Sequence, residues 1–151
     1  MCETESGWYF DVLDIAIKGL KQRVEVNDIK SYMKSVSILQ QIQDFRSIKL
    51  DVGRGIGKTS YIASRASQKD LIMFSCQTQK RIFAYADIDA IYLSGSIRDF
   101  ERKLFGKSME YETIWIDDFS RLERDYGANR ILTILSWHLR KDKLPIFVLL
   151  G

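Results

Sequence analysis

The chain has 151 residues, a length that suits one domain, and its 46 % hydrophobic and 28 % charged residues are an ordinary globular balance. One Pro, nine Gly and a net charge of +3 exclude low-complexity and collagen-like classes and argue against long disorder. The sequence has no apolar run near the roughly 18 residues of a membrane span, and its single histidine, His138, excludes a multi-histidine metal site.

Residues 1–46 have the spacing of amphipathic helices. Apolar positions such as Val12, Ile15, Ala16 and Leu20 recur every three or four residues. The pattern predicts helices at 8–22 and 27–44, with Asn27 and Asp28 as cap residues of the second. We expect this N-terminal segment to form a helical layer packed on the rest of the chain.

From residue 47 the pattern changes to short apolar runs that alternate with helices. Strands are predicted at 47–52, 70–75, 90–93, 113–116 and 146–150, and helices at 58–67 and 128–141. Continuous apolar strands between helices are typical of a parallel sheet covered on both faces. The sequence therefore predicts a three-layer α/β fold with a mostly parallel sheet.

A glycine-rich segment, Val52-Gly53-Arg54-Gly55-Ile56-Gly57-Lys58-Thr59, joins the first predicted strand to a helix. Glycines allow the positive φ values and close backbone approach that a phosphate-cradling loop requires, and the helix directs N–H groups at the anion. Lys58 would reach the β- and γ-phosphates and Thr59 would bind Mg²⁺. The strict pattern asks for Gly where Val52 stands, and a chance glycine turn is the alternative. The predicted nucleotide-binding residues are Gly53, Arg54, Gly55, Ile56, Gly57, Lys58, Thr59 and Ser60.

A second motif is the apolar strand Ile114-Trp115-Ile116 followed by two acids, Asp117 and Asp118. A carboxylate at such a strand end holds Mg²⁺ beside a phosphate loop, which is the role predicted for Asp117. Asp118 would polarise the attacking water, although Asp is one methylene shorter than the usual Glu. A solvated strand end is the alternative for a pair of acids taken alone.

The two motifs together resemble the additional-strand (ASCE) class of P-loop NTPases, and most of all the ATPase of phage DNA-packaging motors, the large terminases. The resemblance covers residues 47–151 and rests on those motifs and on Arg54, four residues before Lys58. It implies Mg²⁺-dependent hydrolysis of ATP coupled to DNA translocation or to remodelling of a partner, in a homo-oligomer or larger motor assembly. It also implies that Arg54 senses or stabilises the γ-phosphate and that the 146–150 strand lies between the 47–52 and 113–116 strands. The family also has a glutamine before the first strand that contacts adenine; Gln40, Gln41 or Gln43 would fill that place, and a glutamine on a helix surface is the alternative for each of them.

The chain departs from that family in having no nuclease domain and in stopping at Gly151, straight after the strand expected to carry a sensor residue. It is either a fragment cut after that strand or a minimal ATPase core. Two other functions stay open: a non-hydrolysing nucleotide-binding regulatory module, and a small-molecule kinase with its lid in residues 94–112. We expect no membrane partner and a cytoplasmic location, in the host cytoplasm if the protein is viral.

Several other residues have an alternative to a functional role. Arg121, Arg124 and Arg130 would serve as an arginine finger or form a solvated basic face. Four aromatic residues near basic side chains would stack single-stranded nucleic acid or lie in the core: Phe100, Phe105, Tyr111 and Trp115. Lys58 itself is expected to be solvated when no nucleotide is bound.

Overall fold

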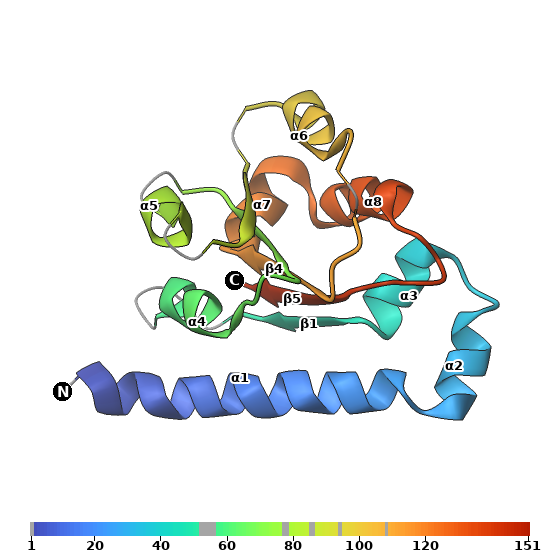
Figure 1. The fold of residues 1–151 in the computed structure, drawn as a ribbon, viewed down its shortest axis with the longest axis horizontal. Helices are drawn as coiled ribbons and strands as arrows, with labels where there is room; N and C mark the ends of the chain where they lie inside the picture. Colours follow the sequence, from blue (N-terminus) through green and yellow to red (C-terminus); the bar gives the residue numbers. More distant parts are fainter. Residues whose placement is uncertain (1, 52–56, 77–78, 85–86, 94, 108) are drawn as a thin grey trace.

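A computed structural model of the chain describes all residues except 1, 52–56, 77–78, 85–86, 94 and 108 (Figure 1). Its centre is a sheet of five strands, and every adjacent pair of strands is parallel. This confirms the α/β class predicted from the alternation of apolar runs with helices. The strands are β1 (Ser47–Leu50), β2 (Leu71–Phe74), β3 (Asp89–Tyr92), β4 (Thr113–Asp117) and β5 (Ile146–Leu150).

The strand order is β1-β5-β4-β2-β3, so β5 lies between β1 and β4 as expected. Ser47 is paired with Phe147 in one ladder, and Thr113 with Ile146 in the other. Because all strands are parallel, their carboxyl ends meet at one edge of the sheet. The end of β1, which precedes the glycine-rich segment in the chain, and the two acids at the end of β4 therefore lie at the same edge.

Helices cover both faces of the sheet, which makes the fold three-layered. Alternate residues of each strand point to opposite faces: Ile72 and Trp115 face one core, whereas Met73 and Ile116 face the other. The first core is completed by α1 (Cys2–Val24), α2 (Asn27–Met33), α4 (Lys58–Arg65) and α5 (Gln79–Ala84). The second is completed by α3 (Ile38–Asp44), α6 (Ile97–Leu104), α7 (Phe119–Tyr126) and α8 (Ala128–His138).

The N-terminal helix α1 runs along one face of the molecule (Figure 1). Leu13, Ile17, Leu20 and Val24 recur at helical spacing and are buried in the first core. Helices α1 and α2 thus form a layer against this face of the sheet, whereas α3 packs on the opposite face. Among the described residues, no helix combines the length and the apolar character needed to cross a bilayer.

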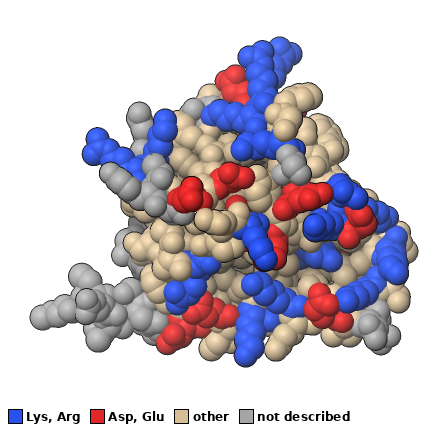
Figure 2. Space-filling view, in the orientation of Figure 1, with Lys and Arg blue, Asp and Glu red and all other residues tan. Residues whose placement is uncertain are grey.

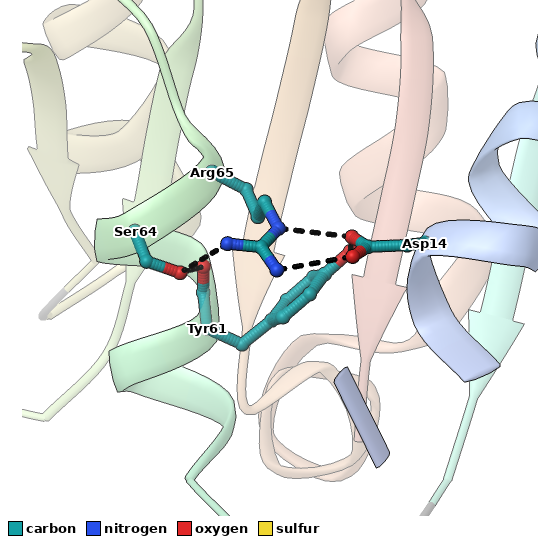
Figure 3. Close-up of polar contacts among 4 residues, drawn as sticks. All are labelled: Asp14, Tyr61, Ser64 and Arg65. Atoms are coloured by element: carbon teal, nitrogen blue, oxygen red, sulfur yellow. Dashed lines mark hydrogen bonds and ion pairs between the residues drawn. The ribbon is translucent and has the colours of Figure 1, made fainter. Parts of the chain in front are cut away.

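A polar cluster fastens α1 to α4 (Figure 3). The Arg65 guanidinium donates from Nε and Nη2 to the two carboxylate oxygens of Asp14, at 3.0 Å each. The hydroxyl of fully buried Tyr61 donates to Asp14 Oδ1 at 2.7 Å. Bonds from Arg65 and Tyr61 lower the pKa of Asp14, against the effect of burial. The helix that starts at Lys58 is therefore held to the N-terminal layer by a charge-assisted contact.

The predicted helix 27–44 is wrong, because the structure has two helices there. Ser37 breaks the run as the N-cap of α3, with its hydroxyl accepting from the Gln40 backbone N–H at 3.2 Å. The N-cap of α2 is Val26, not Asn27 or Asp28. Helices α5, α6 and α7 had no predicted range.

Candidate functional site

The glycine-rich segment is described from Gly57 onward, so the predicted binding residues Gly53, Arg54, Gly55 and Ile56 lie outside the described residues. Gly57 has φ +81° and caps α4, a backbone conformation that favours glycine. The helix then starts at Lys58, with its first N–H groups at the carboxyl edge of the sheet. Ser60 is exposed on its first turn. The described part thus consists of β1 and, after the glycine-rich segment, the helix α4.

Lys58 is half-buried, and its ammonium group donates to the backbone carbonyl of Gly151 at 2.6 Å. The expectation that this side chain is solvated is therefore wrong. Gly151 directly follows β5, and β5 is paired with β1. Its carbonyl is therefore close to Lys58, the first residue of α4. One of the three ammonium donors is used in this bond. The structure thus places a positive charge at the sheet edge between the ends of β1 and β5.

Thr59 and Asp117 meet at this edge although they lie 58 residues apart in the sequence. The Thr59 hydroxyl donates to Asp117 Oδ2 at 2.6 Å. Asp117 is 1 % exposed, and burial raises the pKa of its carboxyl group. The Thr59 bond and the charge of Lys58 oppose that effect. The structure therefore brings together three of the residues predicted to bind phosphate and metal: Lys58, Thr59 and Asp117.

Asp118 follows in the left-handed region, with φ 57° and ψ 45°, and is half-buried at the N-cap position of α7. Asp tolerates this region better than most residues, yet such a backbone still costs on the order of 1 kcal/mol. Its side chain makes no capping hydrogen bond. Residues with strained backbone conformations are frequent at functional sites, which agrees with the water-orienting role predicted for Asp118.

Gln79, at the start of α5, completes the cluster and was not predicted. Its side-chain Nε2 donates to Thr59 Oγ1 at 2.9 Å and to Asp117 Oδ2 at 2.7 Å. Its Oε1 is buried and has no hydrogen-bond partner among the described residues. No sequence pattern signals this residue, because its partners lie 20 and 38 positions away.

Gly151 packs tightly against the start of α7. A Cβ added at this glycine would lie 2.1 Å from Ser120 Oγ and 3.3 Å from Asp51 Oδ1. The hydroxyl of Ser120 thus fills the space that a side chain at the end of β5 would need. The polar group next to the end of β5 is therefore the Ser120 hydroxyl of α7, not a side chain of β5 itself.

The three glutamines proposed for adenine lie on α3, which precedes β1 and is therefore at the amino edge of the sheet, away from Lys58 (Figure 1). Gln41 is buried and donates to the carbonyl of Val36 at 3.2 Å. Gln43 donates to Asn129 at 3.0 Å, and Gln40 is exposed. Their position and these local contacts argue against an adenine role.

The candidate arginine fingers are all exposed: Arg121, Arg124 and Arg130. Arg121 lies 4.0 Å from Asp125, and both line a cavity of about 400 Å³ beside the carboxyl ends of β2 and β3. Ser75, whose buried Oγ has no partner among the described residues, lines the same cavity. A larger cavity, of about 740 Å³, lies at the amino edge and is lined by none of the residues predicted to bind nucleotide or metal.

The four aromatic residues do not form one exposed stacking surface. Phe100 and Trp115 are buried, and the Trp115 indole N–H donates to Asp70 at 3.1 Å. Tyr111 is half-buried and donates to Asp89, so Phe105 alone is exposed, packed edge-on against His138. Lys and Arg side chains are interspersed with Asp and Glu over the face in Figure 2.

Thr59 and Asp117 could hold Mg²⁺ together with a nucleotide. Within the described part of the chain, no three His, Cys, Asp or Glu side chains converge on a metal position. Magnesium takes one or two protein oxygens and completes its shell with phosphate oxygens and water. Asp117 and Thr59 offer oxygens of that kind, and the unpartnered Gln79 Oε1 is ready to accept from a water molecule.

Comparisons with known proteins do not place the chain in a family. No family model matches the sequence, and neither a curated protein nor a solved structure is significantly similar to it. A functional conclusion therefore rests on the residues and geometry of the site, because a fold alone does not determine function.

Proposed function

We propose that this protein is a P-loop NTPase that binds ATP with Mg²⁺ and hydrolyses it. The observation that carries the proposal is the 2.6 Å contact between Thr59 and Asp117, next to the ammonium group of Lys58. A hydroxyl, a carboxylate and an ammonium group from two separate motifs meet at one sheet edge, where ligands bind in open α/β sheets. A solvated strand end would not bring Asp117 to 1 % exposure against Thr59.

The residues divide the work by their chemistry. The Lys58 ammonium group would donate to phosphate oxygens, either in place of its bond to the Gly151 carbonyl or in addition to it. The first N–H groups of α4 would bind the same phosphate. Thr59 and Asp117 would hold Mg²⁺, which neutralises charge on the phosphates when bound. Asp118 would orient the attacking water, and Arg54 would stabilise the γ-phosphate. Such catalysis depends on positioning and electrostatics rather than on covalent chemistry.

We further propose that hydrolysis drives movement of DNA or remodelling of a partner, within a homo-oligomer or a larger motor. This part rests on the resemblance of the loop, with Arg54 before Lys58, to packaging ATPases. The net charge of +3 is small for a protein that binds DNA by electrostatics alone, and basic and acidic side chains are interspersed on the face in Figure 2. DNA binding would thus need a specific surface or several subunits together.

The kinase alternative needs a lid that closes over the acceptor, and residues 94–112 were its candidate. That stretch contains α6, whose Phe100 and Leu104 are buried in the core. Its N-terminus is fixed by reciprocal hydrogen bonds between Ser96 and Asp99. A helix anchored in this way favours the ATPase over the kinase.

The test is phosphate release from ATP, with Mg²⁺, in the presence and absence of DNA. We expect turnover by the wild-type chain, loss of turnover and of nucleotide affinity in Lys58→Ala, and loss of turnover alone in Asp118→Asn. Lys69→Ala, at an exposed lysine before β2, is the matched control. Binding without turnover would indicate the regulatory module, a phosphorylated acceptor the kinase, and absence of nucleotide binding would reject the proposal.

A further inference from the structure

The side chain of Gln79 connects the two residues that would hold the metal. Its Nε2 lies 2.9 Å from Thr59 Oγ1 and 2.7 Å from Asp117 Oδ2, and these two oxygens are themselves 2.6 Å apart. The three atoms form a closed triangle of hydrogen bonds. Gln79 comes from α5, Thr59 from α4 and Asp117 from β4, so the triangle also joins three elements.

The donors and acceptors of this triangle can be assigned from chemistry. Thr59 uses its single proton on Asp117, so its oxygen can only accept from Gln79. The amide NH₂ group therefore faces both oxygens and is the donor to each of them. One lone pair of the Thr59 oxygen then remains for a metal ion. The same orientation directs Gln79 Oε1, with both of its lone pairs, away from these two bonds.

That oxygen is the anomaly of the site. Gln79 Oε1 is buried and accepts no hydrogen bond from any described residue. A buried acceptor without a donor costs roughly 1–3 kcal/mol. If Gln79 only linked Thr59 to Asp117, its Oε1 would remain buried without a hydrogen-bond donor, and nothing would offset that cost. A water molecule held on a metal beside these two residues would supply the missing donor.

We infer that Gln79 is a positioning residue for Mg²⁺: its NH₂ group holds Thr59 and Asp117 as ligands, and its Oε1 accepts from a metal-bound water. Magnesium keeps several of its waters in sites built around phosphates, so a donor of this kind is expected there. Groups that hold a metal ligand in place typically contribute about 10- to 100-fold to metal affinity. The inference rests on the proposed function, since it assumes that the site binds Mg²⁺ with a nucleotide.

The experiment compares the affinity of the full chain for a fluorescent ATP analogue with and without Mg²⁺, for wild type and Gln79→Met. The ratio of the two affinities measures the metal contribution, and we expect it to fall about 10-fold or more in the variant. Metal-free affinity should change little, because Gln79 is not assigned a phosphate contact. Gln40→Met, the same chemical change at an exposed position on α3, is the control. Gln79→Ala repeats the measurement with a smaller side chain if the Met variant folds poorly.

The outcomes separate the two claims. A wild-type chain whose affinity for the analogue does not depend on Mg²⁺ would overturn the proposed function and the role of Gln79 with it. Mg²⁺-dependent binding that is equal in wild type and both Gln79 variants would overturn the role of Gln79 alone. A lower thermal stability of Gln79→Met with an unchanged metal ratio would also overturn it, because that pattern marks a structural bridge.

Discussion

Replacing Asp117 by Asn should stabilise the nucleotide-free protein while it impairs the site. Asp117 is 1 % exposed, and burial raises the pKa of its carboxyl group. A carboxyl whose pKa is raised by folding favours the folded state at low pH, and this contribution is lost as the pH rises through the folded pKa. At neutral pH the buried charge is therefore a cost. Asn keeps the shape and an oxygen that accepts from Thr59 and Gln79, but carries no charge.

The two effects can be measured in one thermal unfolding experiment with and without Mg²⁺ and ATP. At a ligand concentration of about 100 Kd, binding raises the free energy of unfolding of the wild type by about 2.7 kcal/mol. This corresponds to a rise in Tm of roughly 5–10 °C for a chain of this size. If Asp117→Asn weakens binding about 100-fold, the gain falls to about 0.4 kcal/mol, or roughly 1–2 °C. Without ligand, the variant should unfold at the same temperature as wild type or up to about 4 °C higher.

The matched control is Asp142→Asn, which removes an exposed carboxylate paired with Arg140. It should leave both the ligand-free Tm and the ligand-induced rise unchanged. A full Mg²⁺-ATP response in Asp117→Asn would refute the metal role of Asp117. A marked loss of stability without ligand would refute the argument that its buried charge is a cost.

Three further outcomes follow from contacts of the described residues. Asp14→Asn should cost about 0.5–1 kcal/mol at pH 7, since its pair with Arg65 is partly exposed. Because the pKa of Asp14 is lowered, this loss should vanish as the pH falls below about 4, which urea unfolding at several pH values would check. Lys58→Ala should weaken binding of an ATP analogue about 10- to 150-fold, the worth of a charge-assisted bond, and an unchanged titration would contradict its phosphate role. Gly151→Ala should destabilise the fold by about 1 kcal/mol or less, because Ser120 Oγ must rotate away from the new methyl group, and Ser120→Ala should restore part of that loss in chemical denaturation.

The sheet could be predicted because its strands are continuous apolar runs. Strands such as Thr113–Asp117 and Ile146–Leu150 are buried on both faces, and their sequences show it directly. The break between α2 and α3 was missed because the helical spacing of Ile29, Met33 and Val36 continues beyond the end of α2 at Met33, almost to Ser37, which caps the start of α3. Helices of six to eight residues, such as α5 and α6, contain too few turns for a period to stand out.

Residues of the candidate site that belong to a local sequence motif could be predicted. Residues that reach the site only through the tertiary fold could not. Lys58, Thr59 and Asp117 each lie at the end or start of a recognisable element, so their residue types were informative. The partner of Lys58 is a backbone carbonyl at Gly151, which no side-chain pattern indicates. Gln79 likewise depends on where α5 lies relative to α4 and β4.

The pairing of β1 with β5 also has a consequence for the order in which the protein is built. Ser47 lies beside Phe147, so the strand that leads into the glycine-rich segment finds its partner 100 residues later in the chain. Contacts this distant in sequence form late, because a long loop must close before they stabilise anything. During synthesis, β1 must wait until β5 has left the ribosome. We expect the cluster of Lys58, Thr59 and Asp117 to be among the last parts of the molecule to assemble, so that the proposed nucleotide site would form only once β5 has paired.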